Sequence, residues 1–375
     1  MRAVITVISD VKTDRRVLKH SSLLKETGFD VTIIGRRCRN GEKLPEENSQ
    51  IVRLRIPFSK GPLMYLAFNI RLFFSLLFRR ADLYLANDLD TLLPAFMISK
   101  LFGRQLIYDS HEYFTGQHGL AERRLKHNVW KWIERRTLPR IKWMITVSPS
   151  IAALYKEEYG VSAVVVRNVS MPSAGIVLRS RSDTGAGDDD LLAVFQGSGI
   201  NPGRGAEELI DAMALTSGVR LLIIGSGDAI DSVIKLAALR GVSDKVKFLN
   251  RMPWEEMMSY TRCCDVGLSL DKDTCVNQRY SLPNKLFDYI SAGIPVIASP
   301  LTEVKTLVEG YGCGLILSEV TPAAIAETLN RVRDDKLFLA SLKRKAEQAA
   351  EDLTWEKEKI REQDLLRSVI NRVIK

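Results

Sequence analysis

The sequence lacks features that mark several protein classes. Residues 1–27 contain no glycine, whereas a dinucleotide-binding domain carries a glycine-rich turn directly after its first strand. This absence disfavours a Rossmann-type dehydrogenase. The five cysteines include no C-x-x-C pair. Their odd number argues against a disulfide framework, so we expect reduced thiols and a cytoplasmic location.

Long apolar runs are also missing. Residues 1–10 are predicted to be a strand and not a signal peptide, because the apolar run is short and no small-residue cleavage pattern follows it. The longest apolar stretch, residues 63–78, contains Arg71 and is shorter than the ~20 residues that cross a bilayer. We therefore expect no transmembrane segment.

The length and charge of the chain set broad limits. A chain of 375 residues is long enough for about two domains, each with its own core. The net charge of +9 favours anionic partners, such as a nucleotide, a phosphorylated lipid, an acidic membrane or a nucleic acid. The charge alone does not choose among them.

Strand and helix patterns alternate along the chain, which is typical of βαβ units around parallel sheets. A segment rich in Ser, Gly and Asp, residues 171–190, interrupts the alternation and is predicted to be a linker. We predict two doubly wound α/β domains, residues 1–170 and 191–352, and a charged helix at 353–375 that packs back on the first domain. The predicted strands are 3–8, 30–34, 83–86, 105–108, 144–147, 192–196, 219–224, 246–249, 266–270 and 295–298; the main predicted helices are 17–27, 207–215, 229–239, 254–263 and 282–292.

A glycine-rich loop follows the predicted strand 192–196. It runs from Gly197 through Ser198 and Gly199 to Arg204 and Gly205. Such a loop lets the backbone approach a ligand and offers N–H groups to phosphate oxygens, while an arginine adds a charge-assisted contact. The alternative is a flexible surface loop with a solvated arginine. The pair Gly225 and Gly227 is a weaker signal, because two glycines often only make a tight turn.

The predicted helix 282–292 is a candidate clamp for a nucleoside diphosphate. Helix N-termini favour anions because their first N–H groups are unpaired and the helix dipole is positive there. Lys285 lies in the first turns, and Asp288 follows three residues later on the same face. This arrangement suits a phosphate near Lys285 and a ribose diol near Asp288.

His111 follows the predicted strand 105–108, with Asp109 and Glu112 beside it. Side chains at the carboxyl ends of parallel strands line the ligand crevice. A lone histidine is more often structural than catalytic, so both interpretations stay open. Three Asp-x-Asp patterns, at residues 88–90, 188–190 and 271–273, keep a divalent-metal site as a less favoured alternative.

Two helical patterns could dock on an anionic bilayer. Residues 63–80 are mostly apolar with one polar stripe, and residues 122–143 are basic with apolar residues at helical spacing. The alternatives are a buried helix and a solvated basic face. The polar stripe consists of Arg71, Ser75 and Arg79, and the apolar positions of the basic segment are Leu125, Val129, Trp132 and Ile133.

Taken in order, these segments resemble the retaining GT-B glycosyltransferases of the family-4 type. The resemblance covers nearly the whole chain. It is carried by residues 14–19, 86–90, 108–112, 145–150, 165–169, 195–205, 225–228 and 281–299.

The resemblance implies a GT-B fold of two Rossmann-like domains that face a cleft. It also implies a hexosyltransferase that moves a sugar from a nucleoside-diphosphate donor to an acceptor, such as a lipid-linked or other cell-envelope glycan in polysaccharide biosynthesis. The expected enzyme retains anomeric configuration, needs no metal or other cofactor, binds no nucleic acid and is cytoplasmic, with peripheral attachment to the inner face of the membrane.

By matching positions, the resemblance assigns catalytic roles to His111, Arg204 and Lys285. Arg204 and Lys285 would bind the diphosphate, Asp288 the ribose, and His111 would lie near the transferred sugar. The turn at 249–253 would lie against the base. The implied donor site comprises Gly197, Ser198, Gly199, Arg204, Gly227, Arg251, Met252, Asn284, Lys285, Leu286 and Asp288.

The sequence departs from the family pattern at two places. Of the two acidic residues that the family often separates by seven positions, the second is Asp288, but Tyr280 occupies the first. The basic residue after the first glycine of the phosphate loop is replaced by Ser198 and Gly199. Two other classes stay as alternatives, a nucleotide-dependent oxidoreductase and a non-catalytic membrane-surface adaptor.

Overall fold

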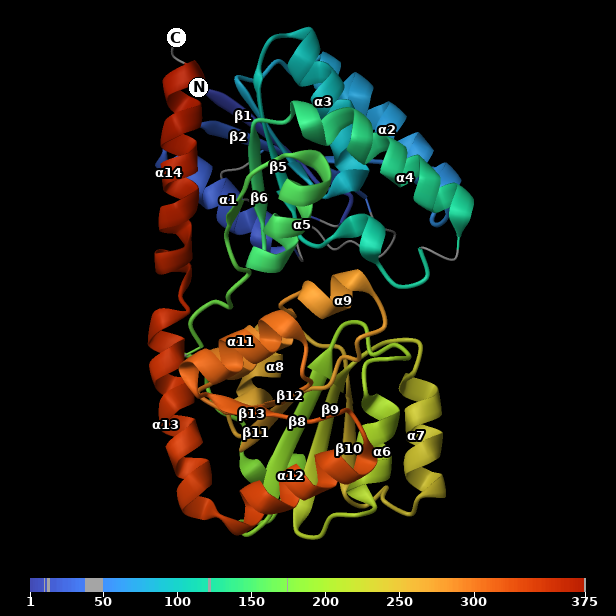
Figure 1. The fold of residues 1–375 in the computed structure, drawn as a ribbon, viewed down its shortest axis with the longest axis vertical. Helices are drawn as coiled ribbons and strands as arrows, with labels where there is room; N and C mark the ends of the chain where they lie inside the picture. The colour runs from blue at the N-terminus through green and yellow to red at the C-terminus, as the bar shows by residue number, and fades with distance from the viewer. Residues whose placement is uncertain (10, 12–13, 38–49, 121–122, 174, 374–375) are drawn as a thin grey trace. The chain divides into compact units, whose positions relative to one another are not determined.

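The computed structural model describes the chain except for residues 10, 12–13, 38–49, 121–122, 174 and 374–375. The chain divides into two compact units (Figure 1). The first unit contains Met1–Arg167 together with Lys359–Lys375, and the second contains Asn168–Glu358. Each unit is built around one parallel sheet, as the alternating strand and helix patterns predict.

The first unit holds a seven-stranded sheet of order β3-β2-β1-β4-β5-β6-β7. The neighbouring strands are all parallel. β4 is buried along its whole length, as expected of a central strand covered on both faces. The strands are β1 (Arg2–Thr6), β2 (Asp30–Arg36), β3 (Gln50–Leu54), β4 (Leu83–Asn87), β5 (Gln105–Ser110), β6 (Trp143–Thr146) and β7 (Ala163–Val165).

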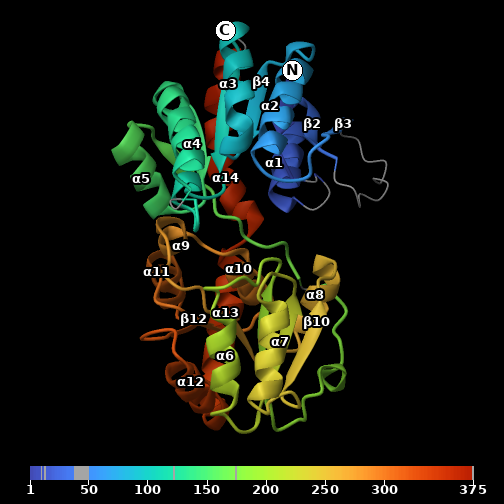
Figure 2. The same ribbon diagram turned by 90° about the vertical axis from the view of Figure 1, so that its right-hand side faces the viewer.

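The helices of the first unit connect these strands. α2 packs against α3, and α3 packs against α4, so the three lie side by side (Figure 2). Asp14 caps α1 by accepting a hydrogen bond from the N–H of Val17, as N-cap aspartates commonly do. The helices are α1 (Arg15–Glu26), α2 (Pro62–Leu77), α3 (Leu89–Leu101), α4 (Arg124–Thr137) and α5 (Pro149–Tyr159), with 3-10 turns η2 (Phe114–Gly116) and η3 (Leu138–Arg140); residues from Lys359 onward in α14 (Trp355–Val373) complete the unit.

The second unit holds a six-stranded parallel sheet of order β10-β9-β8-β11-β12-β13. Its strands are β8 (Leu191–Gly197), β9 (Val219–Gly225), β10 (Val246–Asn250), β11 (Val266–Ser269), β12 (Val296–Ala298) and β13 (Gly314–Ile316). Its helices are η4 (Arg181–Thr184), α6 (Ala206–Met213), α7 (Ile230–Leu239), α8 (Trp254–Thr261), α9 (Val276–Tyr280), α10 (Asn284–Ser291), α11 (Thr302–Tyr311), α12 (Pro322–Asp334) and α13 (Lys336–Asp352).

The segment predicted as a linker, residues 171–190, lies within the second unit. Arg181 donates to Asp265 at 2.8 Å. Arg262 donates to the backbone carbonyls of Ser173 and Ile176 at 3.0 and 2.8 Å. These contacts hold the described part of the segment on the surface of that unit.

The helix predicted at 282–292 begins later than expected. The structure has two helices here, α9 and α10, and Pro283 is the N-cap of α10. A residue before proline is pushed away from helical backbone angles, so Leu282 cannot continue α9 into α10. The short strands β3, β7 and β13 were not predicted. Among the described residues, no helix is both long and apolar enough to cross a membrane.

Candidate functional site

In the second unit, the glycine loop after β8 packs directly on the turn after β9. The N–H of Ile200 donates to the carbonyl of Ser226 at 3.0 Å, and the N–H of Ala229 donates to Ile200 at 3.0 Å. A Cβ on Gly225 would lie 1.8 Å from the carbonyl oxygen of Gly197, and one on Gly227 would lie 2.3 Å from that of Ile200. The close approach of the two loops is therefore enough to require glycine at both positions.

Arg204 and Lys285 meet at one buried carboxylate, Asp271, which follows β11. Arg204 Nη1 donates to Asp271 Oδ1 at 2.8 Å, and Lys285 Nζ lies 3.2 Å from Asp271 Oδ2. Asp271 is 2% exposed. Burial alone would raise the pKa of its carboxyl, but Lys285 and Arg204 outweigh burial and hold that pKa below its usual value. Two cations share one anion, which leaves a surplus of positive charge.

Lys285 contacts an aromatic ring as well as the carboxylate of Asp271. Its ammonium lies 4.7 Å from the centre of the Phe195 ring, within the range of a cation–π contact. Burial and the nearby Arg204 lower the pKa of Lys285, against the opposing effect of Asp271. An added anion would favour the charged form of this lysine.

The other predicted donor residues lie at the same end of the second sheet. Gly197 ends β8 and is followed by Ser198 and Gly199, while Arg251 and Met252 follow β10. Because carboxyl ends of adjacent parallel strands share one edge, these positions lie along that edge. Asn284 and Leu286 belong to the first turn of α10; Asn284 accepts from Asn168 at 2.9 Å, and the Leu286 side chain is in the core.

Asp288 is buried and already has three donors within the second unit. Oδ1 accepts from the hydroxyl of Ser170 and from Trp254 Nε1 at 2.9 Å, and Oδ2 accepts from Gln196 Nε2 at 3.3 Å. A ribose diol that binds this carboxylate would have to share or displace these donors. The helix spacing correctly puts Lys285 and Asp288 on one helix, but gives no sign of how fully Asp288 is engaged.

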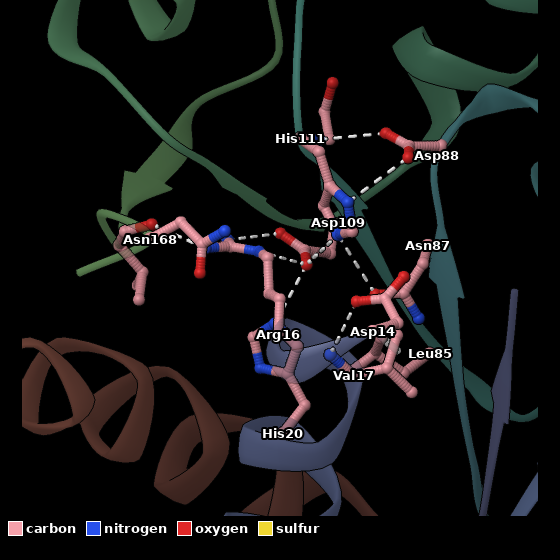
Figure 3. A network of polar contacts seen from close by, with 12 residues as sticks. Asp14, Arg16, Val17, His20, Leu85, Asn87, Asp88, Asp109, His111 and Asn168 are labelled. Atoms are coloured by element: carbon pink, nitrogen blue, oxygen red, sulfur yellow. Dashed lines mark hydrogen bonds and ion pairs between the residues drawn. The ribbon is translucent and has the colours of Figure 1, made fainter. Parts of the chain in front are cut away.

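The first unit contains a separate network of charged side chains around Asp109 (Figure 3). Arg16 makes a bidentate contact with this carboxylate, Nε to Oδ2 at 2.8 Å and Nη2 to Oδ1 at 2.6 Å. His20 Nε2 lies 2.8 Å and His111 Nε2 lies 2.9 Å from Oδ2. Burial alone would raise the pKa of Asp109, but Arg16, His111 and His20 hold it well below its usual range.

His111 is placed between two carboxylates. Its Nδ1 lies 3.2 Å from Asp88 Oδ2, opposite the contact with Asp109. Burial lowers the pKa of His111, but Asp88 and Asp109 outweigh it and raise the pKa to about 9. Two carboxylates on opposite sides of the ring thus favour its imidazolium form, which donates from both nitrogens.

Asp88 itself adopts an unusual backbone conformation. It is the one non-glycine residue with a positive φ, 59°, in the described part of the chain. Its Oδ1 accepts the backbone N–H of His111 at 2.9 Å. Asp88, in the turn after β4, therefore contacts both the backbone and the side chain of His111 after β5. A non-glycine residue with a positive φ is strained, and strained residues often lie at functional sites.

The sequence did not point to Arg16, His20 or Glu362 as parts of a polar network. His20 Nδ1 lies 2.6 Å from Glu362 Oε1, and both side chains are fully buried. The sequence offered only a local indication of this network. Arg16 and His20 are four residues apart in α1 and share the helix face with buried apolar residues.

Each of the three Asp-x-Asp patterns has a member that pairs with a basic side chain: in the pattern 188–190, Asp190 Oδ2 lies 3.3 Å from Arg220 Nε. Asp88 contacts His111, Asp271 contacts Arg204 and Lys285, and Asp273 contacts Arg279 at 2.8 Å. Asp90 Oδ1, in contrast, is buried without a hydrogen-bond partner in the described part of the chain. Among the residues with described positions, no group of three or more His, Cys, Asp or Glu side chains could hold a metal ion.

Comparison with known proteins identifies the family. A family model described as "Glycosyltransferase Family 4" matches residues 14–169, and one described as "Glycosyl transferases group 1" matches residues 179–352. No curated protein sequence matches the chain.

Solved structures match over nearly full length at low identity. Sucrose-phosphate synthase from Thermosynechococcus elongatus is 16% identical with a TM-score of 0.80, covering 99% of this chain and 100% of that chain. Anabaena Alr3699/HepE in complex with UDP-glucose is 16% identical with a TM-score of 0.75, covering 99% and 100%. WaaG, a glycosyltransferase involved in lipopolysaccharide biosynthesis, is 14% identical with a TM-score of 0.70, covering 97% and 98%. The chain therefore belongs to the family-4-type glycosyltransferases of GT-B fold.

Proposed function

We propose that the second unit binds a nucleoside-diphosphate sugar and that the enzyme transfers the sugar to a glycan acceptor. The observation that carries this proposal is the pairing of Arg204 and Lys285 with the single buried carboxylate of Asp271. Its surplus positive charge lies beside the glycine loop and the N-terminus of α10, which supply further attraction for phosphate. The UDP-glucose complex of Alr3699/HepE is consistent with such a donor.

In the proposed reaction, Arg204 and Lys285 offset the charge that develops on the departing nucleoside diphosphate. A cation ~4 Å from an anion contributes ~4 kcal/mol at an effective dielectric near 20, before desolvation. Groups already fixed by Asp271 need little reorganisation when the charge develops. This supports the expectation that the reaction needs no metal, which equal activity with and without EDTA would test.

The donor proposal is tested by thermal-shift measurements with UDP, GDP, ADP and NAD. A ligand that binds only the folded state raises the apparent stability, by about 2.7 kcal/mol at a hundredfold excess over Kd. We expect a nucleoside diphosphate to stabilise the protein and NAD to have no effect. Lys285→Ala should abolish the shift, whereas Lys305→Ala, at an exposed site in α11, should keep it. No shift with any diphosphate would contradict the proposal.

We further propose that transfer retains the anomeric configuration and that His111 lies beside the transferred sugar. The support is the family membership and the position of His111 at the carboxyl end of β5. NMR of the product linkage distinguishes retention from inversion. Full activity in His111→Ala would remove this residue from the reaction.

For the acceptor, we propose a lipid-linked or other cell-envelope glycan, as in polysaccharide biosynthesis, reached at an anionic membrane surface. The first unit exposes an apolar stripe along α2 that ends at Phe78, which is 81% exposed. α4 adds a second stripe that begins at Leu125, and Tyr65 of α2 contacts Trp130 of α4 at 5.4 Å. Basic residues accompany both stripes, which suits an anionic bilayer: Arg71 lies within α2 and Arg79 and Arg80 just after it, whereas α4 carries Arg124, Lys126, Lys131, Arg135 and Arg136. The exposed apolar side chains are Leu63, Leu66, Ile70, Phe74 and Phe78 on and just after α2, and Leu125, Val129 and Trp132 on α4; Ile133 is buried.

Vesicle co-sedimentation tests the membrane surface. Binding to phosphatidylglycerol vesicles should exceed binding to phosphatidylcholine vesicles and should fall with added salt. Phe74→Ser with Phe78→Ser should weaken binding at least tenfold. Leu337→Ser, an equally exposed position in the second unit, is the control. Equal binding by both variants would rule out this surface.

A further inference from the structure

A continuous chain of charged groups links α14 to His111 within the first unit. Glu362 Oε1 lies 2.6 Å from His20 Nδ1, His20 Nε2 lies 2.8 Å from Asp109 Oδ2, and the same oxygen lies 2.9 Å from His111 Nε2. The charges alternate in sign along this path. Its inner members are shielded from water, because Glu362, His20 and Asp109 are each 0% exposed, whereas His111 is 22% exposed.

Both ring nitrogens of His20 lie within hydrogen-bond distance of a carboxylate. This arrangement favours a ring that is protonated on both nitrogens and donates from both. Burial lowers the pKa of His20, but Glu362 and Asp109 outweigh it and raise the pKa to about 9. The ring thus fixes the position of Asp109 from one side while Arg16 fixes it from the other.

We propose that His20 and Glu362 are positioning residues for the transfer reaction. Through Asp109 they fix the ring orientation and the protonation of His111, so the C-terminal helix contributes to the function of the first unit without touching substrate. This inference rests on the proposed placement of His111 beside the transferred sugar.

Stability alone does not account for such a network. Burying a group of charges is often no more stabilising than packing apolar side chains of similar volume. A network in which every inner group has a partner does, however, restrict each side chain to one geometry. The exposed end of this chain is His111, which is the member able to meet a ligand.

The experiment uses the full chain with Glu362→Gln, which keeps the shape of the side chain and removes its charge. The protein has four histidines, so spectra of protein labelled with 15N-histidine are simple to assign. Without the Glu362 charge, His20 should lose its proton more easily. Asp109 would then face one cation fewer and attract the His111 proton more strongly. The pH midpoint of the His111 titration should therefore rise by at least half a pH unit. The charged groups that face these two rings are Arg16, Asp88, Asp109 and Glu362, and Asp14 and Asp90 act on the same cluster through their charge.

The kinetic readout is release of the nucleoside diphosphate from the nucleotide sugar whose diphosphate stabilises the wild-type protein in the thermal-shift test, with UDP-glucose as the first probe. The Glu362→Gln variant should lower kcat three- to tenfold and leave KM for the donor within twofold of wild type. Glu362→Asp, which keeps the charge, should restore part of the loss. Asp364→Asn removes an exposed carboxylate that pairs with Arg367 on the same helix and should change neither readout.

Two outcomes overturn the inference. One is a Glu362→Gln variant whose His111 resonances and kcat match those of Asp364→Asn. The other is full activity in His111→Ala, since the network would then have no functional group to position. Failure of the donor proposal would appear separately, as the absence of nucleotide binding by the wild-type protein. The His111 spectrum does not depend on nucleotide binding.

Discussion

The two units handle buried charge in opposite ways. In the first unit, three cations, Arg16, His20 and His111, face the three carboxylates of Asp88, Asp109 and Glu362. In the second unit, Arg204 and Lys285 share Asp271. The charges in the balanced first network pair off, although the buried Oε2 of Glu362 has no hydrogen-bond partner among the described residues, whereas the unbalanced second set keeps affinity for a further anion. The comparison separates a network that orients side chains from one that is prepared to bind ligand.

The largest expected effect comes from breaking the balanced network at its centre. Asp109→Asn removes the charge that faces Arg16 and His20 while both stay buried. Breaking a buried pair in this way costs about 3–5 kcal/mol. Chemical denaturation should show that loss in the free energy of unfolding, and Asp364→Asn should stay within about 0.5 kcal/mol of wild type. An Asp109→Asn protein as stable as wild type would show that the Asp109 charge is not needed to hold Arg16 and His20 in the folded protein.

The balanced network should also make stability depend on pH. His20 and His111 have pKa values raised to about 9, above the ordinary value near 6.5. Their contribution is fully present below pH ~6.5 and is lost as the pH rises through about 9. The free energy of unfolding should therefore fall by up to about 1.4 kcal/mol per pH unit for each histidine in this interval.

This pH dependence has an internal control. Denaturation of Lys285→Ala should show the same slope, because the second unit contributes no histidine to its cation pair. His20→Gln should roughly halve the slope. A flat profile between pH 6.5 and 9 would show that neither ring is held as an imidazolium in the folded protein.

The unbalanced site should respond in turnover more than in stability. Lys285→Ala is expected to lower kcat at least tenfold at saturating donor, which corresponds to about 1.4 kcal/mol of transition-state stabilisation. The remaining pair, Arg204 with Asp271, is neutral overall and attracts a diphosphate less. Lys305→Ala serves as the control, and an unchanged kcat in Lys285→Ala would remove this lysine from the chemistry.

The sequence was sufficient for the fold and the family because both depend on local pattern. Alternating strand and helix signals predicted two parallel α/β domains, and the order of the motifs predicted the glycosyltransferase family; both predictions are confirmed. The alternatives of an oxidoreductase and a non-catalytic adaptor are wrong. Short edge strands such as β3 and β13 escaped prediction because a few half-buried residues carry little periodicity.

The candidate sites were only partly predictable. Spacing was enough to place Lys285 and Asp288 on one helix. Spacing could not show that Asp271 joins Arg204 to Lys285, since 67 positions separate Arg204 from Asp271. The contact of His20 with Glu362 spans 342 positions, and only the folded chain brings them together.

The smallest expected effect concerns Asp288. This residue tests whether a buried carboxylate of the second unit binds ligand or, like Asp109 in the first unit, only orients side chains. Its carboxylate resembles Asp109 in being buried and fully contacted, yet its donors, Ser170, Trp254 and Gln196, are neutral. A neutral hydrogen bond contributes about 0.5–1.5 kcal/mol. If a ribose shares this carboxylate, Asp288→Asn should raise the Kd for UDP about three- to tenfold and leave the Kd for pyrophosphate unchanged.

Calorimetry with both ligands distinguishes this specific effect from a general disturbance of the site, which would weaken the binding of both ligands equally. Asp273→Asn, at an exposed pair with Arg279, should change neither. Equal weakening of UDP and pyrophosphate would place Asp288 with Asp109, as a residue that holds the protein rather than the donor.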